Sequence, residues 1–144
     1  MRLNLLDLIQ TLRKQEMLPD VHALLADPDD AIRERALKCV RALADPSSAE
    51  PLLRAAAKEP DEYLRVELGE ALIELGDRRG VPILLDVMAS GEARQARKDA
   101  WEHLSAHVEL PLPFHPDFES AEHEAEIRSL LDWWKQKGGE APLQ

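Results

Sequence analysis

The chain has little of several things that small proteins use to fold or to react. Cys39 is the only cysteine among 144 residues, so no intramolecular disulfide can form, and only six residues are aromatic. No apolar run approaches the roughly 18 residues of a membrane-spanning helix, because the most apolar stretch ends at Asp86. The first residues include Asn4 and Asp7 and no cleavage site of small residues, which argues against a signal peptide. We therefore expect a cytoplasmic protein without a membrane span.

Motifs for catalysis and nucleotide binding are absent as well. The chain has no glycine-rich phosphate loop, no Gly-x-Ser-x-Gly and no paired cysteines. With 28 acidic against 18 basic residues, its formal charge of -10 disfavours phosphate-rich partners. Arg78, Arg79 and Arg94 fall in turns on opposite edges and form no single basic face. The sequence predicts no catalytic residue, no cofactor and no nucleic-acid binding.

What the chain does contain is an internal repeat of 32 residues. The stretch from Asp27 to Arg33 matches Glu59 to Arg65 at this offset, and Ala96-Arg97 belongs to a fainter third copy. Apolar residues recur at helical spacing behind each copy. Self-similarity of this period is typical of stacked helical hairpins, because one hairpin cannot bury its own apolar stripe.

Each repeat is predicted to hold two helices. Asp29 and Asp61 lie where a carboxylate can cap the second helix, and Pro51 and Pro82 lie in the opening turn of the first. Gly76 lies where a second helix ends. The pattern predicts no strand, and helices over about 3–15, 19–26, 30–44, 48–58, 62–75, 80–90, 93–107 and 120–137.

This hairpin, with its Asp-Pro-Asp-x-x-Ile-Arg approach to the second helix, resembles the HEAT-like repeats of phycobiliprotein lyases and many bacterial scaffolds. The resemblance covers residues 18–107, although Glu92 stands in the third copy where the others carry proline. It implies a short right-handed all-α solenoid that holds another macromolecule, with a reaction only in a minority of members. We expect one domain: a capping helix (1–17), three hairpins (18–107), and a proline- and aromatic-rich segment with a C-terminal capping helix (108–144).

Aromatic residues concentrate at the C-terminal end. Five of the six lie beyond residue 100: Trp101, Phe114, Phe118, Trp133 and Trp134. Three prolines exclude a helix over residues 109–118. Two interpretations remain open, a set of rings that covers the last hairpin and an aromatic hot spot that binds a partner.

Two other features recur with the repeat. Arg33, Arg65 and Arg97 are predicted to form a structural row that bonds to carboxylates and carbonyls of adjacent hairpins. Gly69 lies inside a predicted helix, where glycine is unfavourable. It indicates either a close helix contact, making room for a neighbour such as Trp101 or Tyr63, or plain tolerance.

His103 and His107 lie four residues apart on one predicted helix, a spacing that can present two imidazoles to zinc. They do not form a His-Glu-x-x-His motif. His115, His123 or Glu124 could supply a third ligand only if the proline segment folds back. We therefore interpret the two histidines as solvated or packed under the cap, and predict no metal site.

The predicted binding surface is the row of second-helix positions that the apolar stripe leaves exposed. These positions are Arg35, Lys38 and Arg41 in the first copy, Glu67, Glu70 and Glu74 in the second, and Asp99 and Glu102 in the third. They are either ordinary solvated helix faces or a groove that selects a basic partner. We predict a non-catalytic protein-binding scaffold, monomeric or weakly oligomeric. The alternative is a phycobilin-lyase-like or chaperone-like accessory subunit.

Overall fold

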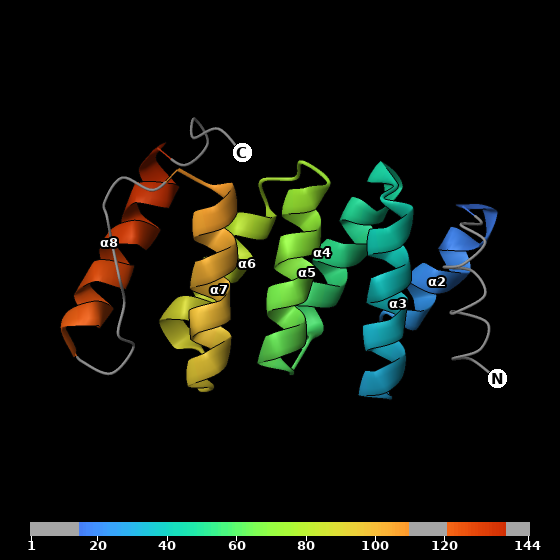
Figure 1. The fold of residues 1–144 in the computed structure, drawn as a ribbon, viewed down its shortest axis with the longest axis horizontal. Coiled ribbons are helices and arrows are strands. Elements are labelled where there is room, and N and C mark those ends of the chain that lie inside the picture. The colour runs from blue at the N-terminus through green and yellow to red at the C-terminus, as the bar shows by residue number, and fades with distance from the viewer. Residues whose placement is uncertain (1–14, 110–120, 138–144) are drawn as a thin grey trace. The chain divides into compact units, whose positions relative to one another are not determined.

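The computed structural model describes residues 15–109 and 121–137, and these residues form helices joined by short turns (Figure 1). No strand occurs in these two ranges. The helices are η1 (Gln15–Met17), α2 (Leu18–Leu24), α3 (Asp30–Leu43), η2 (Pro46–Ser48), α4 (Ala49–Lys58), α5 (Glu62–Glu74), α6 (Gly80–Ser90), α7 (Arg94–His107) and α8 (Ala121–Lys137). The predicted all-α fold of helical hairpins is confirmed. Of the predicted helix over 3–15, residues 3–14 lie outside the described residues.

The chain divides into two compact units, residues 1–58 and 59–144. In the first unit α2 packs against α3. His22 Nε2 lies 2.8 Å from the hydroxyl of Ser48, a fully buried side chain. Burial lowers the pKa of His22, against the opposing effect of the nearby Asp45 carboxylate. That the whole chain forms one domain stays a prediction.

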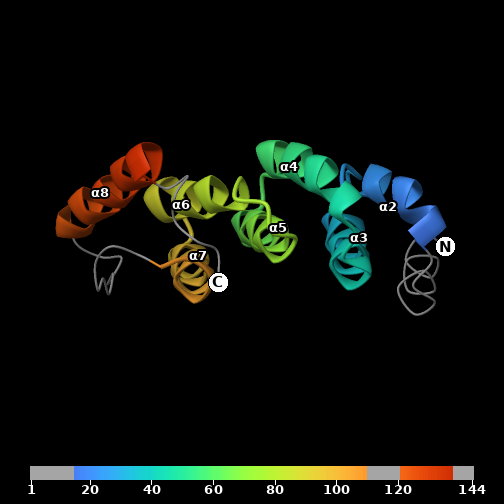
Figure 2. The same cartoon turned by 90° about the horizontal axis from the view of Figure 1, so that it is seen from above.

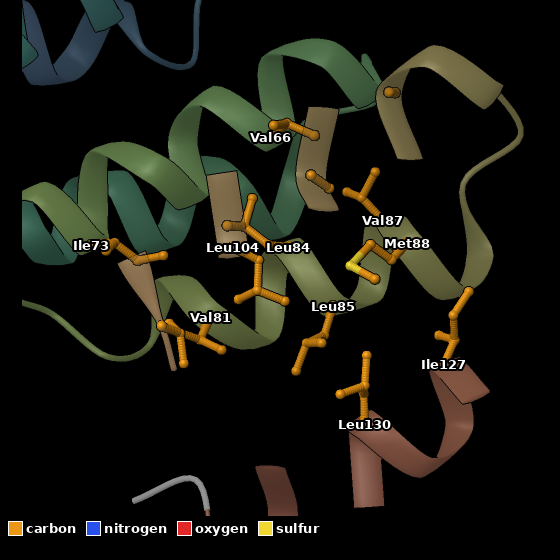
Figure 3. Close-up of a cluster of buried hydrophobic side chains, with 13 residues drawn as sticks. Val66, Ile73, Val81, Leu84, Leu85, Val87, Met88, Leu104, Ile127 and Leu130 are labelled. Atoms are coloured by element: carbon orange, nitrogen blue, oxygen red, sulfur yellow. The ribbon is translucent and has the colours of Figure 1, made fainter. Parts of the chain in front are cut away.

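The second unit has two layers of helices. Figure 2 shows α6 and α8 in one layer and α5 and α7 in the other. α6 packs against all three of the others, and α5 also packs against α7. Figure 3 shows the buried cluster that they share. It comprises Val66, Ile73, Val81, Leu84, Leu85, Val87, Met88, Ala96, Ala100, Leu104, Val108, Ile127 and Leu130.

The predicted caps of two second helices are present. Asp29 caps α3, with its carboxylate accepting from Ala31 N at 2.9 Å. Asp61 caps α5 and accepts from the amides of Tyr63 and Leu64 at 2.9 and 3.2 Å. A carboxylate at this position satisfies backbone N–H groups that have no partner within the helix. The repeated acidic residue therefore fixes where α3 and α5 begin.

The ends of these two helices differ in the residue that turns the chain. Gly76 follows α5 with a φ of 81°, and Asp77 N donates to Leu72 O at 2.9 Å across the turn. At the equivalent position after α3, Ala44 adopts a φ of 50°. A left-handed conformation suits glycine, whereas in alanine the Cβ is crowded.

Gly69 lies at a close contact between α5 and α6. A Cβ added to Gly69 would lie 3.2 Å from the carbonyl oxygen of Gly80, and one added to Gly80 would lie 2.3 Å from that of Gly69. The predicted close contact is confirmed, but its neighbour is different. Gly80, Leu84 and Ile83 lie nearest, rather than Trp101 or Tyr63, because the contact is with the first helix of the next hairpin.

Candidate functional site

The two helices that form one layer of the second unit, α5 and α7, carry six carboxylates, of which five are predicted binding residues. We call Glu67, Glu70, Glu74, Asp99 and Glu102 the acidic face: the first three lie on α5 and the last two on α7. Their spacing of three or four residues places those on each helix along one side of it. Glu74 and Glu102 are exposed, while Glu67 and Asp99 are half-buried. The structure thus places the predicted residues of the second and third copies on two helices that pack against each other.

Glu70 is bound from the neighbouring helix, contrary to its predicted exposure. Its Oε1 lies 2.8 Å from His103 Nδ1 and 3.7 Å from His107 Nε2, and only 13% of its side chain is exposed. The two imidazoles, one turn apart on α7, cover the carboxylate. We call Glu70, His103 and His107 the glutamate–histidine cluster.

The histidine spacing was visible in the sequence, but the facing carboxylate was not. His103 aligns with Cys39 and Ala71, and His107 aligns with Leu43 and Leu75. The third copy thus replaces small or apolar side chains with imidazoles at two positions facing α5, and this substitution was the signal available. Within the ranges that the structure describes, no three His, Cys, Asp or Glu side chains are placed to hold a metal ion.

The basic positions of the first copy lie on α3, in the first unit. Arg35 and Lys38 are exposed, and Arg41 is half-buried. Lys38 Nζ lies 3.4 Å from Glu34 Oε1, one turn earlier on the same helix. That these residues continue the acidic face as one groove stays a prediction.

The start of α7 is held by a residue that the sequence analysis did not single out. Glu62, at the start of α5, accepts from Glu92 N through Oε1 at 2.6 Å and from Ala93 N through Oε2 at 2.7 Å. These two backbone hydrogen bonds are the main cause that lowers the pKa of Glu62. Glu62, at the start of α5, therefore binds the start of α7, and Glu70, farther along α5, binds residues farther along α7. This order shows that the two helices run parallel.

The repeated arginines bind carbonyl and carboxylate oxygens, the two kinds of partner that were predicted for them. Arg33 Nη1 donates to the carbonyl oxygens of Asp27 and Pro28 at 2.9 and 3.1 Å, in the turn before its own helix. Arg65 Nη1 lies 3.4 Å from Asp86 Oδ2 on α6, in the adjacent hairpin. Arg65 therefore makes the predicted bond to a neighbouring hairpin, whereas these two bonds of Arg33 stay within its own hairpin.

The described aromatic residues of the C-terminal end contact the buried cluster. Trp101, Trp133 and Trp134 are half-buried and pack against it. The rings of Trp133 and Trp134 have centroids 6.0 Å apart and are tilted by 56°. Phe114 and Phe118 lie outside the described residues. A cap and a partner-binding hot spot both stay predictions for this group.

The chain matches the family model of HEAT repeats over residues 1–73 and again over residues 18–105. It is also similar to phycocyanobilin lyase subunit alpha from Picosynechococcus sp. (strain PCC 7002), at 29% identity over 122 residues. That match covers 78% of this chain and 45% of the lyase subunit, so the chain spans about half the length of this relative. In the described residues, no helix has the length and apolar character to cross a membrane. The repeated hairpins and the family match agree that the chain belongs to the HEAT repeat family.

Proposed function

We propose that this protein is a non-catalytic binding module whose acidic face receives a partner protein with a basic surface. The observation that carries the proposal is the set of five carboxylates on the parallel helices α5 and α7. The basic residues of α7, Arg94, Arg97 and Lys98, lie in its first half, whereas Glu102 lies beyond them. Membership in the HEAT repeat family supports a scaffold role, and we expect it in the cytoplasm as a monomer or weak oligomer.

Electrostatics would act mainly on how fast and in which orientation the partner binds. Complementary charges steer encounter and fix register, whereas exposed ion pairs add little to final affinity. The half-buried Glu67 and Asp99 are less solvated than fully exposed carboxylates, which strengthens their attraction for a cation. A partner with a row of lysine or arginine side chains would match this surface.

The test begins with capture of partners from a lysate of the source organism and continues with association kinetics on the purified partner. Reversing two charges of the acidic face, Glu67→Lys with Glu102→Lys, should slow association strongly and flatten its salt dependence. Glu70 is left intact because it also joins α5 to α7. Asp132→Lys is the matched control, since Asp132 is exposed on α8 in the same unit. Equal effects of both changes would overturn the proposed surface.

The similarity to phycocyanobilin lyase subunit alpha supports a second candidate, an accessory subunit that handles a bilin or assists a lyase. Incubation of the full chain with phycocyanobilin tests it through the visible absorption spectrum. A shifted band that persists through gel filtration would favour this candidate. We expect no shift if the protein is a binding module alone.

A further inference from the structure

We propose that His103 and His107 make the acidic face sensitive to pH, so that it binds a cationic partner more weakly when the imidazoles are protonated. The inference rests on the proposed function, because it concerns how the same surface is regulated. Histidine is the side chain whose ordinary titration range falls between about pH 5 and 8. The glutamate–histidine cluster places two such groups on one carboxylate of the acidic face.

Both histidines lie close enough to Glu70 for their protonation to change the interactions of its carboxylate. An ionised carboxylate only accepts hydrogen bonds, so His103 donates through Nδ1 at 2.8 Å. His107 Nε2 lies 3.7 Å from the same oxygen. The imidazole side chains are 36% and 27% exposed, so protons reach them from solvent without any opening of the fold.

The two helices that pack against α7 carry mostly acidic residues among their charged side chains. On α5, Glu67 and Glu74 share the side of the helix that carries Glu70. Asp86 is the only ionisable residue of α6, and it lies 3.4 Å from Arg65 Nη1. On α7 itself, Asp99 accepts from Gln95 Nε2 at 2.8 Å, Glu102 lies next to His103 in sequence, and Lys98 is the nearest cation in sequence.

Protonation of the two imidazoles therefore acts on an excess of negative charge. With both imidazoles neutral, the five carboxylates present their full negative charge to a partner. When both imidazoles are protonated, two positive charges offset part of that field, and each ring becomes a charge-assisted donor to Glu70. A partner lysine must then compete with bound imidazolium groups for Glu70, and it meets a weaker field at the other four carboxylates.

A synthetic lysine-rich peptide is the probe, and its affinity for the full chain is measured at about pH 8 and pH 5.5 at constant ionic strength. Exposed ion pairs contribute a few tenths to about 1 kcal/mol each, so we expect about threefold to tenfold weaker binding at the lower pH. The double variant His103→Gln with His107→Gln should lose most of this change. His22→Gln, in the first unit, is the control and should keep it.

A second readout does not depend on the peptide. The carbon-13 resonance of the Glu70 carboxyl group, observed in the full chain, should move between the same two pH values, because the charge of the two imidazoles beside it changes. The movement should be lost in the double variant. A resonance that does not move between these two pH values, or equal pH dependence of peptide binding in the wild type and the double variant, would overturn the inference. Failure of the peptide to bind at either pH, with the resonance still moving, would overturn the proposed function and pH-controlled binding, leaving only the titrating cluster.

Discussion

The backbone amides at the starts of α5 and α7 are bound by carboxylates that come from different places in the chain. α5 begins at Glu59-Pro60-Asp61, and Asp61 caps the helix from its own N-terminal end. α7 begins at Gly91-Glu92-Ala93, where no residue of the helix supplies a side-chain cap. The carboxylate of Glu62, about one repeat earlier, binds the amides of Glu92 and of the N-cap residue Ala93. In α5 the amide of the N-cap residue Asp61 donates to the nearby Glu59. In the third repeat, where the sequence motif is degraded, the start of α7 is thus held by a residue of the preceding repeat.

The start of α7, in the third repeat, therefore depends on contacts with the second repeat, whereas the start of α5 depends on residues next to it in sequence. The local cap of α5 forms as soon as its own turn forms. The cap of α7 forms only when α5 and α7 pack side by side, and the same holds for the glutamate–histidine cluster. Both sets of polar contacts therefore require that the two helices of this layer, α5 and α7, are packed together.

The largest expected effect comes from breaking the contact between α5 and α6. Gly80→Ala would place a Cβ 2.3 Å from Gly69 O, a backbone atom that cannot turn aside. We expect a loss of about 2–3 kcal/mol or more in the free energy of unfolding, because the helices must separate. Denaturant unfolding measures it.

Gly76→Ala is the control for this change. A Cβ at Gly76 meets no atom within 4 Å, and only its φ of 81° is unfavourable. It should cost about 1–2 kcal/mol. A milder effect of Gly80→Ala than of Gly76→Ala would contradict the close contact.

Removal of the borrowed cap should destabilise α7 specifically. Glu62→Ala leaves the amides of Glu92 and Ala93 without their acceptor and should cost about 1 to 2 kcal/mol. Hydrogen exchange should accelerate in the first turn of α7, whereas Asp61→Ala should accelerate it in the first turn of α5.

A local cap should rescue the loss. Ala93→Asp places a carboxylate where α3 and α5 carry Asp29 and Asp61. In the Glu62→Ala background it should restore about 1 kcal/mol. The new carboxylate would bind amides within the first turn of α7, as Asp61 does in α5. If Ala93→Asp restores nothing there, the start of α7 does not limit the stability of the variant.

The borrowed cap should also weaken in acid. Hydrogen bonds from two backbone amides lower the pKa of Glu62 in the folded chain. Its contribution is therefore fully present above the pKa of an unfolded glutamate, about 4.3, and is lost as pH falls through the lower folded value. The difference in stability between the wild type and Glu62→Gln should shrink between about pH 5 and 2. A difference that stays constant over this range would contradict the assignment.

The smallest expected effect is a gain at the end of α3. Ala44 adopts a φ of 50° where the next repeat carries Gly76. Ala44→Gly removes the crowding of the Cβ but adds freedom to the unfolded chain, so we expect a net gain of about 0.5 kcal/mol. Thermal unfolding measures it, and a lowered midpoint would show that alanine is not strained there.

The sequence predicted what local patterns encode. The caps at Asp29 and Asp61, the turn at Gly76 and the bounds of α3 to α7 follow from residues close in sequence, and each agrees with the structure within two residues. The roles of Glu62 and Glu70 did not follow, because each acts on a helix about 30 residues away. With 28 acidic residues in the chain, the sequence gives no sign of which carboxylate faces a neighbouring helix.

A map of where a cationic ligand binds tests the acidic face most directly. The full chain, labelled with nitrogen-15, is titrated with a lysine-rich peptide while amide resonances are followed. We predict saturable shifts in α5 and α7 around Glu67 and Glu102, with Asp132 and the rest of α8 unaffected. Shifts confined to α6, α8 or the first unit, or no saturable shift at all, would contradict the acidic face as the binding surface.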